Sequence, residues 1–214
     1  MRRRSLVVAV MLMCASAHAA TDVALDKVLR QMDAASAKFK SAEADLRWDF
    51  YEKVVRDTTT QTGTIYFLHG KTGTEMGAVI GPKYLRFANG NGAMFDRVSK
   101  KTTPFSAGQD RARAESFLTL GFGGSGKDLE KAWTIKLVGM EAIDGTPTVE
   151  MDLTPKEASV ANMFTHILIW IDTTRGISLK QQSFTPEGDN RTAYYTHVKY
   201  NLAVNQKKFA APKH

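Results

Sequence analysis

The residues of this chain whose spacing most suggests chemistry are three glycines. Gly121, Gly123 and Gly126 are spaced as in the G-x-G-x-x-G loop that binds dinucleotides. That loop must follow a strand and open a βαβ unit, whereas a helical pattern precedes these glycines and strand patterns surround them. The sequence therefore predicts a flexible loop between two helices and no nucleotide site.

Metal-binding and nucleophilic residues form no comparable pattern. Beyond residue 19 the histidines are His69, His166, His197 and His214, and no two are spaced to share a helical face. Cys14, the single cysteine, lies in a segment that we expect to be removed, which excludes thiol catalysis and zinc–thiolate sites. No G-x-S-x-G sequence occurs. We predict a protein that is not an enzyme and needs no metal or cofactor, although distant residues that converge in space stay open as a catalytic group.

The first 19 residues have the three-part pattern of a secretory signal. Arginines at positions 2–4 precede an apolar run from Ser5 to Met13, and small residues follow at Ala17 and Ala19. We expect cleavage after Ala19 and export to the periplasm, with one mature domain over residues 20–214. Cys14 suggests a lipoprotein signal instead, but Met13 stands where such a signal requires a small residue.

The charge is only mildly basic once the signal is set aside. The chain has 29 Lys and Arg and 22 Asp and Glu, and removing the three signal arginines lowers the net charge from +7 to +4. The remaining cations are scattered singly or in pairs such as Lys100-Lys101, unlike the basic patches of nucleic-acid binders. We therefore expect a solvated surface and no nucleic-acid partner. From the secretory signal we expect the exported product to be a monomer.

Local patterns place these residues in a mainly β domain. Residues 23–40 have helical apolar spacing, residues 42–55 alternate with period two, and later strand patterns are separated by turn signals such as Asn89-Gly90 and Asp144-Gly145. Further helices are predicted at residues 110–120 and 125–132, the second capped by Ser125 with Asp128. A helical turn capped by Thr154, with Pro155 at its first position, is also predicted. About eleven strands against about three short helices favour a closed or nearly closed sheet, since a flat one would expose long edges.

Apolar side chains along the predicted strands would either fill a packed core or line a cavity. Methionines among them suit a surface that accepts varied apolar ligands. The candidates for lining a lipid cavity are Leu46, Trp48, Phe50, Ile65, Phe67, Met76, Leu85, Phe87, Met94, Phe117, Leu118, Met151 and Ile169.

Several segments resemble the LolA superfamily of periplasmic lipoprotein carriers, in nearly the same order along the chain. They are the first helix with its long strand, Gly63 to Phe67, Asn91 to Asp96, Leu153 to Lys156, Ile169 to Asp172, Gly176 to Gln181, and Asn205 to Pro212. The resemblance implies an incomplete antiparallel β-barrel covered by short helices. It also implies a hydrophobic cavity under a helical lid, which we place in residues 110–132.

The resemblance implies a carrier that collects the acyl chains of lipoproteins from an inner-membrane transporter and surrenders them to an outer-membrane acceptor. Shelter is needed because each exposed methylene costs about 0.8 kcal/mol in water. Two alternatives stay open. One is a LolA-like carrier or sensor of another lipid, in glycolipid transport or envelope-stress sensing, and the other, less supported, is an enzyme acting on lipid.

One departure from the family concerns the lid. The best-known carriers have an Arg-Pro pair after the strand that corresponds to Gly63 to Phe67, and the arginine is thought to tie the lid shut. Here His69-Gly70 stands in that place. His69 is the candidate for the latch, beside the plainer interpretation of a histidine at a strand end. On the same strand we assign Ile65 and Phe67 to the cavity face.

Overall fold

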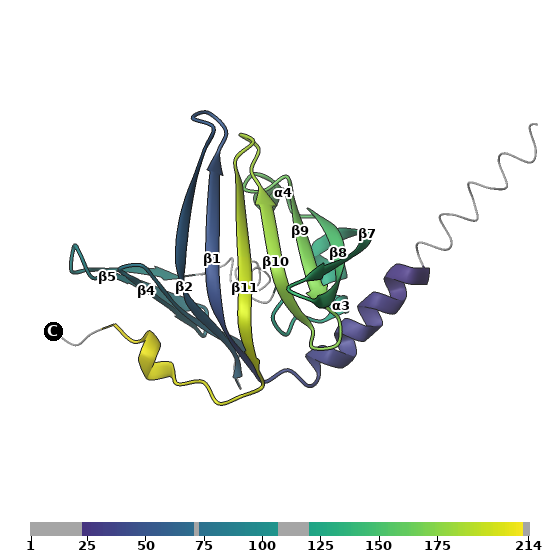
Figure 1. Cartoon of the computed structure of the whole chain (residues 1–214), viewed down its shortest axis with the longest axis horizontal. Coiled ribbons are helices and arrows are strands. Elements are labelled where there is room, and N and C mark those ends of the chain that lie inside the picture. Colours follow the sequence, from purple (N-terminus) through teal and green to yellow (C-terminus); the bar gives the residue numbers. More distant parts are fainter. Residues whose placement is uncertain (1–22, 71–72, 107–119, 212–214) are drawn as a thin grey trace, which may run out of the picture.

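The computed structural model describes residues 23–70, 73–106 and 120–211 (Figure 1). Its strands are β1 (Ser41–Glu52), β2 (Asp57–Gly70), β3 (Gly73–Ile80), β4 (Lys83–Ala88), β5 (Asn91–Asp96), β6 (Lys101–Ser106), β7 (Trp133–Ile143), β8 (Thr146–Pro155), β9 (His166–Asp172), β10 (Ile177–Phe184) and β11 (Asn190–Tyr200). The described helices are an N-terminal helix over residues 23–36, α3 (Gly126–Ala132), α4 (Ala158–Ala161) and the 3₁₀ helix η2 (Gln206–Phe209).

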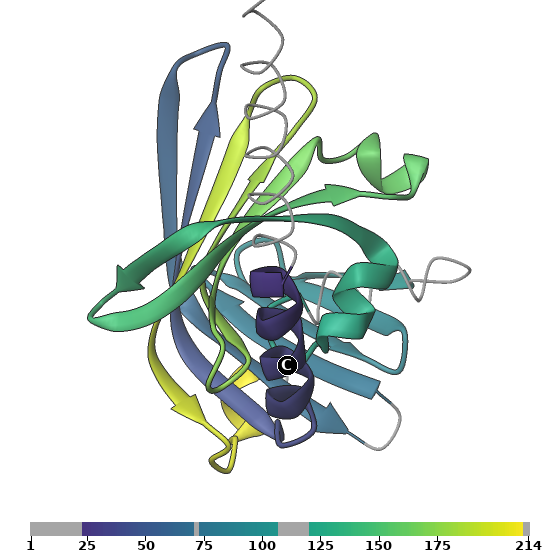
Figure 2. The ribbon, with the colours of Figure 1, turned by 90° about the vertical axis from the view of Figure 1, so that its right-hand side faces the viewer.

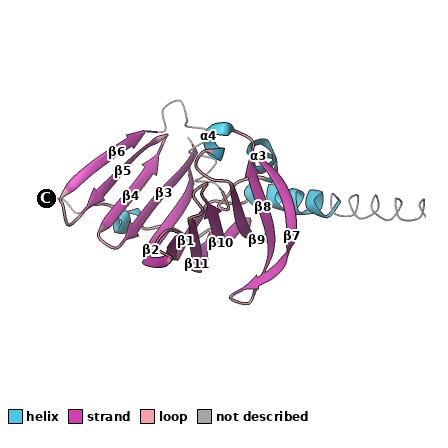
Figure 3. Cartoon of the chain, turned by 90° about the horizontal axis from the view of Figure 1, so that it is seen from above, coloured by secondary structure: helices cyan, strands magenta, loops and turns pink. Residues whose placement is uncertain are grey.

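All eleven strands join one antiparallel sheet in the order β6-β5-β4-β3-β2-β1-β11-β10-β9-β8-β7. Except for β6 and β7, strands that follow one another in the chain are neighbours in the sheet, and the pairing of β1 with β11 joins its two halves. Figure 3 shows from above that the sheet curves like a trough without closing, so β6 and β7 are its edges. The predicted mainly β fold, an incomplete antiparallel barrel with short helices, is confirmed.

Two of the predicted turns form tight hairpins. Asn89 and Gly90 have φ angles of 55° and 78°, and Asp144 and Gly145 have 48° and 75°. Positive φ at both central residues matches the right-handed twist of the flanking strands, which is why Asn-Gly and Asp-Gly are favoured there. These short-range signals set the registers of the β4–β5 and β7–β8 pairs.

The helix boundaries partly differ from the predicted ones. Ser125 caps α3 as predicted, because its hydroxyl accepts a hydrogen bond from the Asp128 amide at 3.1 Å. The cap predicted at Thr154 is wrong: Thr154 and Pro155 remain in β8, paired with β7, and α4 starts after Glu157. Long strand pairing outweighs a local capping pattern here. The predicted helix over residues 110–120 lies outside the described residues, apart from Leu120.

Two apolar clusters share the sheet. The first lies over β1–β4, β10 and β11 and includes Phe39 and Phe122. The second joins β7, β8 and β9 to the N-terminal helix and α3, which lie side by side in Figure 2. None of the described helices is long and apolar enough to cross a membrane.

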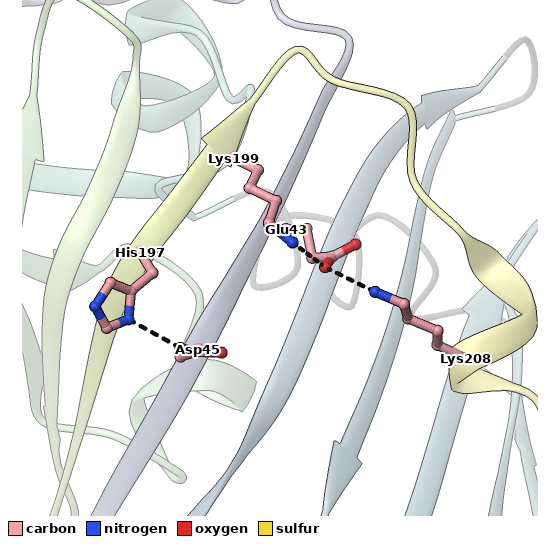
Figure 4. A network of polar contacts seen from close by, with 5 residues as sticks. All are labelled: Glu43, Asp45, His197, Lys199 and Lys208. Atoms are coloured by element: carbon pink, nitrogen blue, oxygen red, sulfur yellow. Dashed lines mark hydrogen bonds and ion pairs between the residues drawn. The ribbon is translucent and has the colours of Figure 1, made fainter.

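The C-terminal segment packs on the other face of the sheet. Phe209 of η2 lies edge-on against Tyr66 at 4.7 Å between ring centroids, and it is buried. Figure 4 shows Glu43 between Lys199 and Lys208, at 3.0 Å and 3.7 Å. The contacts of Lys208 and Phe209 hold η2 against β1 and β2, so β2 is covered on both faces around Tyr66.

Candidate functional site

The first cluster borders an apolar cavity of about 220 Å³. Its walls come from β1–β4, β9, β10 and β11. Leu120, directly before Gly121, and Phe164, after α4, also line it. The lining residues are Leu46, Trp48, Ile65, Phe67, Met76, Ala78, Ile80, Leu85, Leu120, Phe164, Ile167, Gln181, Ser183, Arg191, Ala193 and Tyr195.

Strand register explains why these residues meet. Leu46 and Trp48 alternate with charged residues on β1, so they point to one face of the sheet. Trp48 is paired with Ala193 on β11, and Ile65 on β2 is paired with Ala78 on β3. Because Trp48 and Ile65 each face an alanine on the neighbouring strand, space remains beside them.

Six of the predicted candidates lie together around this cavity. They are Leu46, Trp48, Ile65, Phe67, Met76 and Leu85. Phe87 is buried in the same cluster, Met94 on β5 is paired with Leu85 on β4, and the Phe50 ring lies 4.7 Å from that of Trp48.

The other candidates lie elsewhere. Met151 and Ile169 are fully buried in the second cluster, against the helices, and do not line the cavity. They point inward as the cavity residues do, but helices cover that part of the sheet. Phe117 and Leu118 lie outside the described residues.

Phe122, which the sequence analysis did not single out for the site, packs against the cavity wall. Its ring stacks on Phe67 at 4.0 Å with an interplanar angle of 8°, and it meets the Tyr195 ring edge-on at 4.8 Å. Only 1% of Phe122 is exposed. Phe122 also forms a β-bridge with Ile177, which ties its backbone to the start of β10.

The glycines beside Phe122 serve close packing. Gly121 and Gly123 have φ angles of +84° and +80°, and a Cβ on them would lie 2.3 Å from the Ser178 Cβ and 2.4 Å from the Phe39 ring. The Ser178 amide donates to the Gly121 carbonyl at 2.5 Å. The glycines at positions 121 and 123 are thus explained by the close packing of this loop against Ser178 and Phe39.

The polar groups at the cavity are few. The Gln181 amide donates to the Leu120 carbonyl at 2.5 Å, and the Tyr195 hydroxyl donates to the Gln181 side-chain oxygen at 3.5 Å. Burial raises the pKa of Tyr195 well above its usual range, so the phenol stays neutral. Ser183 and Arg191 complete the polar part of the lining. Within the described ranges no group of three or more metal-binding side chains occurs.

His69 lies exposed at the end of β2, where its backbone amide donates to the Lys40 carbonyl at 2.8 Å. The proposed lid begins in residues outside the described ranges, so a latch from His69 stays a prediction. The described part of the segment predicted as a lid, residues 120–132, packs against β10 and the N-terminal helix through Phe122 and Gly126.

No family model matches the sequence, and no curated protein is similar to it in sequence. Solved structures nevertheless share the fold. One is a chain in the complex of MucA and MucB from Pseudomonas aeruginosa, with a TM-score of 0.55 and 13% identity over 88% of this chain. The match covers 61% of that chain, so this protein spans less than two thirds of it.

Two further structures match over nearly their full length. The lipoprotein LppX of Mycobacterium tuberculosis has a TM-score of 0.53 and 15% identity, over 86% of this chain and 98% of LppX. An uncharacterized conserved protein of Thermus thermophilus has a TM-score of 0.55 and 7% identity, over 88% of this chain and 94% of its own. At such low identities the likeness shows a shared fold.

Proposed function

We propose that this chain is a carrier that shelters lipid acyl chains in the cavity described above. Its sequence resembles the LolA superfamily, and its fold is LolA-like. The observation that carries the proposal is a cavity of about 220 Å³ whose walls are mostly aliphatic and aromatic. Protein interiors rarely leave voids larger than a water molecule, so a cavity of this size and lining suits an apolar occupant.

The finer role that we propose is the transfer of lipoproteins from an inner-membrane transporter to an outer-membrane acceptor. Cavities for drug-sized ligands are about 300–1,000 Å³, so one of about 220 Å³ holds only part of a lipoprotein's acyl chains until it opens. The same volume favours the alternative of a carrier or sensor of another lipid, and in particular of one with a single acyl chain. Mass spectrometry of the lipid that co-purifies with the protein separates the two.

We also propose that the protein acts in the periplasm, as a monomer, after cleavage behind Ala19. The charged, apolar and small-residue order of the first 19 residues supports this. Mass measurement of the mature protein tests it, since a mature chain that begins at an acylated Cys14 would contradict both the cleavage site and the free carrier.

Filling the cavity tests the carrier function. Ala193→Leu adds three carbons to the wall and should weaken the binding of a fluorescent fatty-acid probe about tenfold or more, since each lost methylene contact is worth about 0.8 kcal/mol. The melting temperature should not fall. Ala142→Leu is the matched control, because Ala142 is also a strand alanine but is exposed on β7.

Equal probe binding by both variants, or no probe binding by the wild type, would contradict the carrier. Activity of the wild type on ester or phospholipid substrates would support the enzyme alternative in its place.

A further inference from the structure

One cationic side chain lies at the rim of the apolar cavity. Arg191 is the second residue of β11, and its Cα partners are Phe50 on β1 and Ser183 on β10. The next inward-facing row toward the cavity interior contains Trp48, Ala193 and Gln181 in the same strands. Arg191 and Ser183 therefore form the row of cavity-lining residues just beyond this one. That row lies toward the β1–β2 and β10–β11 hairpins, which are side by side in Figure 1.

The charge of Arg191 is not neutralised by a carboxylate in the described part of the chain. Its guanidinium lies 5.6 Å from the centre of the Phe50 ring, and the residue is exposed. The acidic residues nearest in register are engaged elsewhere. Asp49 alternates with Phe50 to the other face of β1, where it pairs with Arg47 at 3.4 Å, and Asp189 accepts the Lys53 amide at 2.9 Å.

We propose that the cavity binds an amphiphile with one anionic headgroup, a carboxylate or a phosphate, which Arg191 and the Ser183 hydroxyl hold at the rim. The inference rests on the proposed lipid-carrier function and names the class of its ligand. Trp48 and Leu46 contact the acyl chain below. The planar fork of an arginine matches the oxygens of carboxylates and phosphates, and the hydroxyl supplies one more donor.

The position of Arg191 explains why the charge would favour binding. Burying an ion pair costs the hydration of both partners, but an exposed guanidinium at the rim keeps much of its water. The headgroup of the ligand therefore binds at a partly hydrated site, while its acyl chain binds in the apolar cavity. The gain is correspondingly modest and depends on salt, because exposed charges are screened.

Competition against a fluorescent fatty-acid probe tests the inference with ligands that differ in charge. Palmitate and 1-palmitoylglycerol 3-phosphate are compared with neutral 1-palmitoylglycerol. The wild type should bind at least one of the two anions about fivefold more tightly than the neutral lipid, with a smaller ratio at high ionic strength. The anion with the larger ratio identifies the headgroup as carboxylate or phosphate.

Arg191→Gln should reduce this ratio to about one, and Arg191→Lys should keep part of it, because a lysine retains the charge without the fork. Arg47→Gln is the matched control: Arg47 is an exposed arginine of the neighbouring strand that lies over Tyr194, at 4.0 Å, on the opposite face. It should keep the wild-type ratio.

An anion preference that persists in Arg191→Gln, or equal binding of all three lipids by the wild type, would overturn the inference while leaving a lipid carrier in place. If the wild type binds none of them, the proposed function fails first. Melting curves of each variant show that the ratios are compared between folded proteins.

Discussion

Phe122 joins two properties of this protein, the packing of its core and the space left for a ligand. Its ring fills the position between Phe67 and Tyr195, and two glycines with positive φ allow its backbone to approach Ser178 and Phe39. A bound acyl chain would pack against Phe67 and Tyr195, the same cavity-lining side chains that the Phe122 ring contacts. The stability of the empty protein and its affinity for lipid therefore depend on the same side chain.

Phe122→Ala should lower the free energy of unfolding of the delipidated protein by about 3–5 kcal/mol, as removal of a large buried aromatic does. Saturating palmitate should raise the melting temperature of this variant by more than that of the wild type, because the chain occupies the vacated space. Thermal melts with and without palmitate measure both effects.

Phe209→Ala provides the comparison, since Phe209 is equally buried but packs against Tyr66 on the other face of β2. It should lose similar stability and gain no more from palmitate than the wild type. Equal rescue of the two variants would show that Phe122 does not border the ligand.

At the scale of elements, the N-terminal helix and α3 meet at a contact that excludes even a methyl group. A Cβ on Gly126 would lie 2.4 Å from the backbone oxygen of Leu29. Gly126 is the first residue of α3, directly after the Ser125 cap. The close approach brings Leu29 and Leu129 into the second apolar cluster, and so covers the part of the sheet that holds Met151.

Gly126→Ala should destabilise the protein by about 1–3 kcal/mol, because the two helices must separate to admit the methyl group. Gly139→Ala in β7 is the control, since nothing lies within 4 Å of its added Cβ, and it should change the free energy by no more than about 0.5 kcal/mol. Urea unfolding curves measure both, and equal midpoints for the two variants would show that the helix contact can relax without cost.

At the scale of the whole molecule, the buried tyrosines link stability to alkaline pH. Burial raises the pKa of Tyr195, and burial also raises the pKa of Tyr66, where Glu75 adds to the effect and Arg86 opposes it. In the unfolded chain tyrosines lose their protons at a pH of about 10. Above that pH the unfolded state has released protons that the folded state keeps, so folding stability falls.

The urea midpoint of the wild type should therefore fall as the pH rises above about 10, toward the raised pKa values of the folded state. Tyr195→Phe removes one of the two groups and should make this loss less steep. Unfolding curves at a series of alkaline pH values, compared between the two proteins, give the slopes. Identical slopes would exclude Tyr195 as a source of the pH dependence.

The sequence by itself determined the strands, their turns and the cap of α3. These depend on alternation along one strand or on a few adjacent residues, as in Asn89-Gly90, Asp144-Gly145 and Ser125 with Asp128. It also indicated an incomplete antiparallel barrel with short helices, because the order of several weak segment signals is more specific than any one of them. Leu46 and Trp48 could be predicted to share a face for the same local reason.

Only the tertiary structure decided which inward-facing residues meet empty space. Met151 and Trp48 both point inward, yet helices cover Met151 while Trp48 borders the cavity. Phe122 packs on the wall of that cavity and Arg191 lines it, both through contacts between segments distant in the chain. Alternation specifies the face of a strand but not what packs against it, since that depends on where the helices settle on the curved sheet.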